Sequence, residues 1–301
     1  MPISLTMPLQ RAWGRMERML FRPFRIRMWL VLGFAAFLSE YLSGRRPSQF
    51  GFKEHGPAPW HSIGAMSAGV FGNPALIAVA ICVGALALIA IIVLQWVSCR
   101  GRFIFLDGVV HERAAIVEPW RRYSHQGNSL FAWTLVFLLV VGLLLLLAAL
   151  PFLATLQTLW ADNEFNWVGV ASLGGFLLLA FPIGLATAYT LLFLNHFVVP
   201  IMYRHDLGAT AAWGRFLVLF RAHPWWFLAY GLLTLVLWVG ISTVAILLGV
   251  FTCCVGFLLL LTPYIGDVVM LPATVLLRGF GPEFLAQFGP EYDLFAGGTP
   301  V

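Results

Sequence analysis

The sequence predicts an all-α membrane protein, a polytopic transmembrane bundle of about six helices with amphipathic helices at the interface. Three observations lead to this fold class. Hydrophobic residues make up 60% of the 301 residues, whereas soluble domains contain about 45–50%. Charged residues make up 10%, and so few charges do not cover a water-soluble surface. The apolar residues also form long continuous runs, without the alternating pattern of a membrane β-barrel.

Six apolar runs are expected to cross the bilayer as helices, because a helix pairs every backbone polar group within its own segment. All but the first are long enough for a hydrocarbon core of about 30 Å. The predicted spans are 28–42, 74–99, 130–159, 169–199, 227–250 and 254–277. With a cytoplasmic amphipathic segment at 1–27 and a cytoplasmic tail at 278–301, they form one membrane domain over residues 1–301.

The arginines decide whether the short run 28–42 counts as a span. With six spans and a cytoplasmic N-terminus, the inner segments hold 15 of the 18 Lys and Arg residues. Without that span, each side would hold 9. Because cytoplasmic loops carry the excess of basic residues, the count predicts six spans with both termini in the cytoplasm. A re-entrant or interfacial helix at 28–42 is the alternative that its length leaves open.

The first segment is amphipathic, with arginines at helical spacing on one face and apolar residues on the other. These are Arg11, Arg15, Arg18 and Arg22, opposite Leu9, Trp13, Met16 and Leu20. Such a helix lies in the headgroup plane with its arginines toward anionic lipid. We therefore name the four arginines as candidate lipid-headgroup contacts, while a helix that only orients the chain is the simpler interpretation.

Short strings recur along the chain. AWGR occurs at 12–15 and 212–215, and LFR follows at 20–22 and 219–221. This suggests three units, each a basic segment followed by two spans, although chance matching explains short strings equally well. Small residues also repeat every four positions in two spans, at Ala80 and Gly84 and at Ala180, Gly184 and Ala188. That spacing is typical of close helix packing.

Asp267 is the sharpest candidate for a functional residue inside the membrane. It lies eleven residues before Arg278, about 16 Å along a helix, and a charge at that depth is costly. Prolines and glycine beside it predict a broken helix, the arrangement that forms substrate and ion sites in transporters. His196 and Asn195 lie toward the inner end of the fourth span, and His196 would relay protons if it met Asp267. The structural alternative is a carboxyl group hydrogen-bonded inside the bundle.

Signals for other functions are weak. The four cysteines, including the adjacent Cys253 and Cys254, show no metal-ligand spacing, so we expect no metal, no cofactor and free thiols. No nucleotide-binding, zinc-protease or serine-hydrolase motif is present in the sequence, and we expect no catalytic activity. The arginines lie between apolar runs and not on a soluble fold, so nucleic acid is not an expected partner.

The last third contains Cys253–Cys254, PYIG at 263–266, Leu271–Pro272 and FLAQFGPEYDLF at 284–295, and His223–Pro224 lies earlier in the chain. In these residues the chain resembles an uncharacterised family of bacterial six-span membrane proteins. In layout the chain is also loosely similar to the membrane domain of glycerophosphoryl diester phosphodiesterases. The resemblance implies a bacterial inner membrane and carries no site residues.

Three functional hypotheses follow from the sequence. The first is transport, or support of transport or envelope assembly, resting on Asp267. The second is a scaffold that binds membrane lipids or partner proteins, or assembles as a homo-oligomer, through its basic helices. The third and weakest is an enzyme that modifies lipids.

Overall fold

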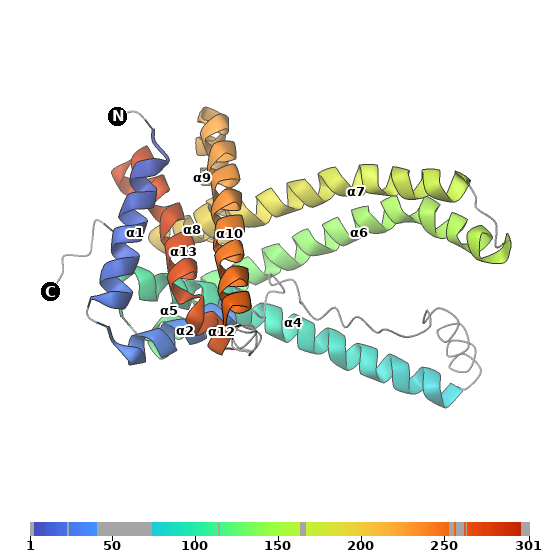
Figure 1. Cartoon of the computed structure of the whole chain (residues 1–301), viewed down its shortest axis with the longest axis horizontal. Helices are drawn as coiled ribbons and strands as arrows, with labels where there is room; N and C mark the ends of the chain where they lie inside the picture. Colours follow the sequence, from blue (N-terminus) through green and yellow to red (C-terminus); the bar gives the residue numbers. More distant parts are fainter. Residues whose placement is uncertain are drawn as a thin grey trace.

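The computed structural model describes residues 3–22, 24–40, 74–113, 115–162, 167–252, 256, 262 and 264–295. Every regular element in these ranges is a helix, which confirms the all-α prediction (Figure 1). The Cys253–Cys254 pair and parts of the predicted spans 28–42 and 254–277 lie outside the described residues.

The described part of the chain contains the following helices in order. They are α1 (Thr6–Phe21), α2 (Ile26–Glu40), α4 (Pro74–Val110), α5 (Val117–Arg122), α6 (Ser124–Asp162), α7 (Trp167–Phe193), the π-helix η1 (Leu194–Val198), α8 (Val199–His205), α9 (Ala209–Ala222), α10 (Pro224–Phe251), α12 (Ile265–Val269), α13 (Leu271–Leu285) and the 3₁₀ turns η2 (Ala286–Phe288) and η3 (Pro290–Tyr292).

Four described helical segments are long and apolar enough to cross a membrane: Pro74–Val110, Ser124–Thr155, Trp167–His205 and Pro224–Phe251. The first predicted span forms only the short apolar helix α2. The described part of the sixth is interrupted at Met270, between α12 and α13. In Figure 1, α10 runs crosswise to α6 and α7, so the apolar helices do not form a parallel bundle. Four spans are therefore supported by length and composition, and the six-span count is not confirmed.

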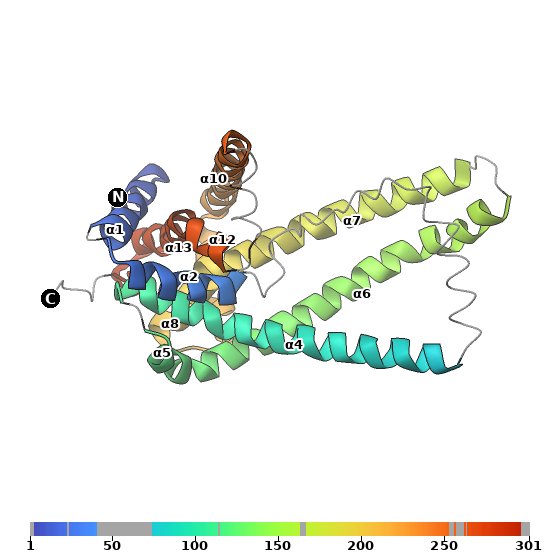
Figure 2. The same cartoon turned by 60° about the horizontal axis from the view of Figure 1, so that its bottom comes forward.

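The molecule divides into a packed part and projecting helices (Figures 1 and 2). We call the packed part the base: α1, α2, residues 98–110 of α4, α5, η1, α8, α9 and α13. The arms are residues 74–97 of α4, 135–162 of α6 and 167–190 of α7. The arm of α4 has no buried residue, whereas its base segment is buried almost throughout. The most apolar stretches of the chain thus project without protein neighbours on most sides.

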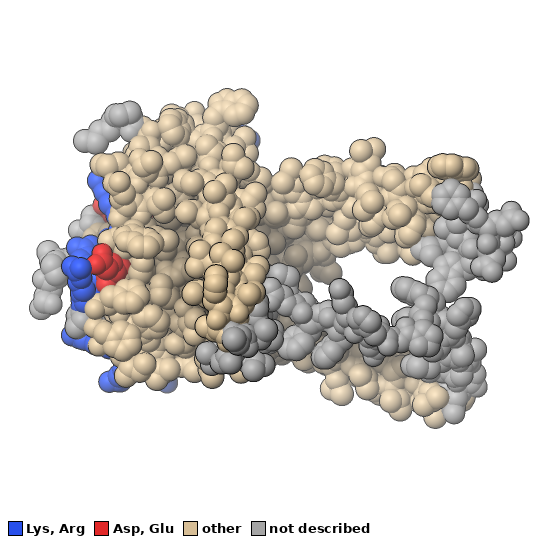
Figure 3. All heavy atoms as spheres, in the orientation of Figure 1, with Lys and Arg blue, Asp and Glu red and all other residues tan. Residues whose placement is uncertain are grey.

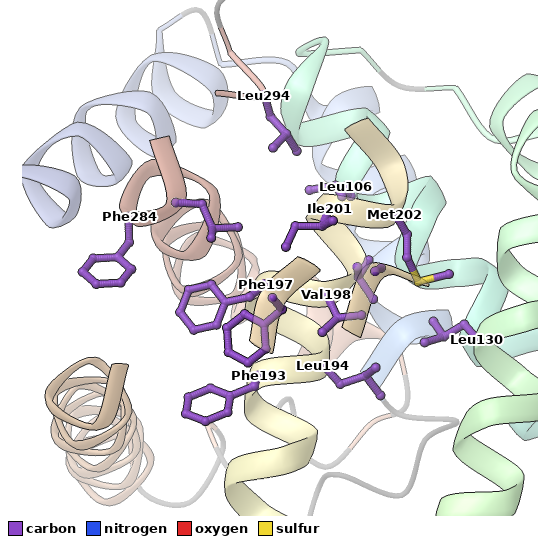
Figure 4. Packing of buried hydrophobic residues seen from close by; sticks show 14 of the residues in the cluster. Leu106, Leu130, Phe193, Leu194, Phe197, Val198, Ile201, Met202, Phe284 and Leu294 are labelled. Atoms are coloured by element: carbon purple, nitrogen blue, oxygen red, sulfur yellow. The ribbon is translucent and has the colours of Figure 1, made fainter. Parts of the chain in front are cut away.

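The core of the base is built mainly from aromatic rings of η1, α9 and α13, and rings of the adjoining helix α10 pack against them. Phe197 of η1 lies against Tyr230 of α10, with ring centroids 4.7 Å apart, and Tyr230 stacks on Phe280 of α13 at 4.5 Å. Figure 4 shows Phe193, Phe197 and Phe284 turned toward one another from α7, η1 and α13. Aromatic side chains bury large areas and add favourable edge and stacking geometry, so they hold these elements in place.

Glycines allow the base helices to approach closely. A Cβ atom on Gly281 would lie 2.3 Å from the carbonyl oxygen of His196, so α13 packs directly on the backbone of η1. Gly101 and Gly108 of α4 likewise face Leu38 and Leu32 of α2.

The sequence predicted close helix packing at the small residues repeated in two spans, and this prediction is wrong at their two glycines. Gly84 and Gly184 have open space where a Cβ atom would stand. Among the described glycines, several of the base, such as Gly101, Gly108 and Gly281, do face a close neighbour.

Candidate functional site

The amphipathic helix α1 packs along α13, although the two are far apart in the sequence (Figure 1). Its buried apolar residues include Ala12, Met16 and Leu20, so most of the predicted apolar face contacts protein. Trp13 differs, because its side chain is 56% exposed. Reciprocal hydrogen bonds at 2.9 Å join the backbone of Ser4 to the side-chain amide of Gln287 and secure the start of α1.

The four predicted headgroup arginines have different surroundings. Arg15 donates to Glu283 of α13 at 3.0 Å, and its guanidinium lies 3.5 Å over the ring of Phe295. The Nε of Arg15 is buried and has no hydrogen-bond partner among the described residues. Arg22 pairs with Glu17 at 2.8 Å and is well exposed. Arg11 and Arg18 are exposed and form no ion pair within the described part of the chain.

A hollow of about 370 Å³ lies between α1 and the end of α13. From α1 it is lined by Arg11, Gly14, Arg15 and Arg18, and from the other side by Glu283, Ala286, Asp293 and Phe295. Three guanidinium groups thus face two carboxylates. Figure 3 shows basic and acidic side chains gathered at this end of the molecule, while the described surface of the arms is uncharged. The arrangement is suited to an anion, because arginine binds phosphate through parallel N–H groups.

Asp267 lies in the five-residue helix α12, and its side chain is 1% exposed. This helix packs on α2, where Gly33 leaves room for Val268, and the Tyr264 hydroxyl donates to the Leu30 carbonyl at 3.0 Å. Leu32, which precedes Gly33 in α2, contacts Gly108 in the base segment of α4. Asp267, which precedes Val268, therefore lies beside the base. The predicted helix break is present at Met270.

His196 and Asn195 both lie in the π-helix η1 and are buried. The Nδ1 of His196 forms a 2.7 Å hydrogen bond with the Tyr230 hydroxyl, and the Asn195 amide donates to the Leu191 carbonyl. Tyr230 is thus a polar partner that the sequence did not single out. The proposed proton relay between His196 and Asp267 stays a prediction.

A second polar cluster was missed from the sequence. The buried carboxylate of Asp107 in α4 accepts hydrogen bonds from Tyr203 of α8 at 2.8 Å and from Arg113 at 3.1 and 3.2 Å. His111 lies 3.2 Å away, and Arg113 also reaches the exposed Glu118 at 3.0 Å. The signal in the sequence was an aspartate near the end of a long apolar run, with a histidine four residues later. This cluster joins α4 to α8 and α5.

Tyr123, next to this cluster, lies outside the candidate spans. Burial raises the pKa of its hydroxyl, and the nearby Asp107 carboxylate acts in the same direction. Its ring also packs against that of Tyr203, with centroids 4.8 Å apart. Within the described residues, no group of three His, Cys, Asp or Glu side chains has the geometry of a metal site.

Fold and site together define a class: an all-helical protein with several helices fit to span a membrane and an arginine-lined base. The chain belongs to the family of unknown function DUF7544, whose model matches residues 6–288. No match was found among curated proteins or among solved structures. The family match agrees with the resemblance to an uncharacterised family. It gives no support to the looser similarity to glycerophosphoryl diester phosphodiesterases.

Proposed function

We propose that this protein is an integral, multi-pass protein of a bacterial inner membrane whose base binds anionic lipid headgroups. The single observation that carries the proposal is the hollow, in which Arg11 and Arg18 form no ion pair with any described residue. Arg15 beside them is partly buried, with a side-chain exposure of 16%. Charged hydrogen bonds at such a partly desolvated site are stronger than those in water.

The arrangement of charge supports a cytoplasmic base. All the described arginines belong to base elements or their connections, and the arms contain no Lys or Arg among their described residues. The positive-inside rule then orients the base toward the cytoplasm. In this topology both ends of the chain are cytoplasmic, because α1 and α13 belong to the base, and the count of six spans stays a prediction.

The experiment compares two double variants of the full chain in neutral detergent. Arg11→Gln/Arg18→Gln removes the unpaired arginines of the hollow, and Arg22→Gln/Arg25→Gln removes the same charge outside it. Bound phosphatidylglycerol and phosphatidylcholine are counted by native mass spectrometry. An arginine near a headgroup contributes about 1 kcal/mol, so the first variant should bind phosphatidylglycerol about 30-fold more weakly.

The control variant should bind like the wild type. Equal retention of phosphatidylglycerol by the wild type and by Arg11→Gln/Arg18→Gln would overturn the proposal. Equal affinity of the wild type for phosphatidylglycerol and phosphatidylcholine would do the same.

Transport remains the second candidate function, and the observation that favours it is the buried carboxylate of Asp267 beside a helix break. Asp267→Asn should abolish proton- or substrate-coupled flux in vesicles while the protein stays folded. An unchanged flux would remove Asp267 from the mechanism. Protein partners and a homo-oligomer stay predictions, as does the lipid-modifying enzyme.

A further inference from the structure

We infer that the hollow between α1 and α13 selects a phosphodiester headgroup that carries hydroxyl groups, such as that of phosphatidylglycerol, over a phosphomonoester such as phosphatidate. This inference rests on the proposed function and names the class of lipid that the site takes. Its basis is the mixture of charges lining one cavity.

The charge of the hollow matches a monoanion. Three arginines face Glu283 and Asp293, which leaves one net positive charge. A phosphodiester carries one negative charge and neutralises that excess. A phosphomonoester near neutral pH carries up to two, because its second pKa is about 6, and it would meet two carboxylates at short range.

The carboxylates also supply hydrogen-bond acceptors for the hydroxyl groups of such a headgroup. Glu283 is engaged by Arg15, whereas Asp293 accepts one hydrogen bond from the described residues, donated by the backbone N–H of Phe295 at 2.8 Å. An ionised carboxylate offers about four acceptor positions, so Asp293 retains capacity. Headgroup hydroxyls donate to such an oxygen, whereas an ionised phosphate has no hydrogen to donate. One side of the hollow therefore binds phosphate and the other binds hydroxyls.

The outward surface of α1 indicates a lipid as the source of the phosphodiester. Met7, Trp13 and Phe21 are 53%, 56% and 48% exposed, and Trp13 immediately precedes Gly14 in the wall of the hollow. Exposed aromatic and apolar side chains beside arginines are typical of helices at the membrane interface. A free phosphodiester would not require such an apolar rim.

Gly14 has no side chain, and this leaves space in the hollow. A Cβ atom at this position would have no neighbour within 4 Å, so a larger side chain fits the helix and projects into the cavity. Gly214 holds the same position in the second AWGR string, and it too has no neighbour within 4 Å. The chain thus provides a test of cavity space with a matched control.

The first test measures the ratio of phosphatidylglycerol to phosphatidate affinity by native mass spectrometry of the full chain, with phosphatidylcholine as the reference lipid. The wild type should favour phosphatidylglycerol at least fivefold. Asp293→Asn keeps an acceptor for Phe295 and removes the charge, so it should lower that ratio at least fivefold, whereas Glu291→Gln, outside the hollow, should leave it unchanged.

Phosphatidate bound as tightly as phosphatidylglycerol by the wild type would overturn the inference, and so would an unchanged ratio in Asp293→Asn. In both cases a preference for anionic lipids over phosphatidylcholine would leave the proposed function standing. Loss of that general preference would instead count against the proposed function itself.

The second test fills the cavity. Gly14→Leu should lose at least tenfold in phosphatidylglycerol affinity with every charge in place, while Gly214→Leu should bind like the wild type. Excess glycerophosphoglycerol, the same headgroup without acyl chains, should not displace the lipid. Unchanged binding by Gly14→Leu would place the lipid elsewhere, and displacement by the soluble headgroup would overturn the assignment to a lipid.

Discussion

Helix α4 passes through both regions of the molecule, and its two halves differ in exposure and in charge. Residues 75–94 form a mostly exposed aliphatic surface, whereas residues 98–109, apart from the half-buried Arg100, are buried against α2, α6 and α8. The arm half contains no charged residue, whereas the base half contains Arg100, Arg102 and Asp107. In the proposed topology, the arms therefore depend on hydrocarbon as their surroundings. The base depends on the packing of its own side chains.

In this chain, buried polar groups indicate contact between protein elements more clearly than apolar groups do. The base holds buried Arg102, Asp107, Asn195 and His196. Between the described parts of the α6 and α7 arms, a polar contact joins the small hydroxyl groups of Thr155 and Ser172 at 2.6 Å. Buried charges require partners, and only the base supplies them. Four experiments test this difference between the arms and the base.

The largest effect is expected in labelling of the chain's own cysteines. Cys82 is exposed on the arm of α4, and Cys99 is fully buried in the base. With Cys253 and Cys254 replaced by serine, a spin label should react at Cys82 and leave Cys99 unmodified until denaturation. Its signal should be relaxed by oxygen, which dissolves in hydrocarbon, and little by a water-soluble nickel complex. Strong relaxation by nickel would place the arm in water.

Removal of the Asp107 carboxylate tests the base. Asp107→Ala removes the buried acceptor that Tyr203 and Arg113 share, and the loss of one partner from a buried pair costs roughly 3–5 kcal/mol. Glu118→Ala removes the exposed partner of the same arginine and should cost under about 1 kcal/mol. Unfolding titrations in micelles measure both, and equal losses would contradict the burial of the cluster.

Glycine substitutions compare packing in the two regions. Gly281→Ala brings a methyl group against the His196 carbonyl and should lower the free energy of unfolding by about 1–3 kcal/mol. Gly142→Ala in the arm of α6 meets nothing within 4 Å and should cause no loss, because alanine favours helix. The same unfolding titration serves here. A destabilised Gly142→Ala would show that this arm face is packed.

The smallest effect concerns the contact between Thr155 of α6 and Ser172 of α7. A double-mutant cycle with alanine at both positions should give a coupling energy of about 0.6 kcal/mol, the usual size for such hydrogen bonds in membranes. No measurable coupling would mean that apolar contact alone holds this hairpin together.

The sequence predicted the four long apolar helices well, because continuous apolar runs are a strong signal. It placed the end of the second run near Cys99, whereas α4 continues to Val110. Arg100, Arg102 and Asp107 made this stretch look like a loop. Asp107 and Arg100 instead form hydrogen bonds with groups distant in sequence, Tyr203 and Asn128 respectively. The predicted tail began at residue 278, whereas residues 278–285 complete α13 and are buried.

Only the α1 side of the candidate site was predicted from the sequence. Helical spacing identified the arginine face of α1, because periodicity is local. Glu283 and Asp293, which give the hollow its mixed charge, are more than 260 positions away. No local pattern joins them to Arg15. Asp267 and the break after it were predicted from the cost of a buried carboxylate and from the flanking prolines, whereas its packing against α2 was not.

The pairing of α1 with α13 has a consequence for how the chain is made. Arg15 and Glu283 are separated by 268 positions, so at about 5–20 residues per second the ribosome needs roughly ten seconds to a minute to deliver the second after the first. During that interval the apolar side of α1 has no α13 to cover it. The nascent helix must wait on a lipid surface or a chaperone, and closure of the two chain ends is the last step of assembly.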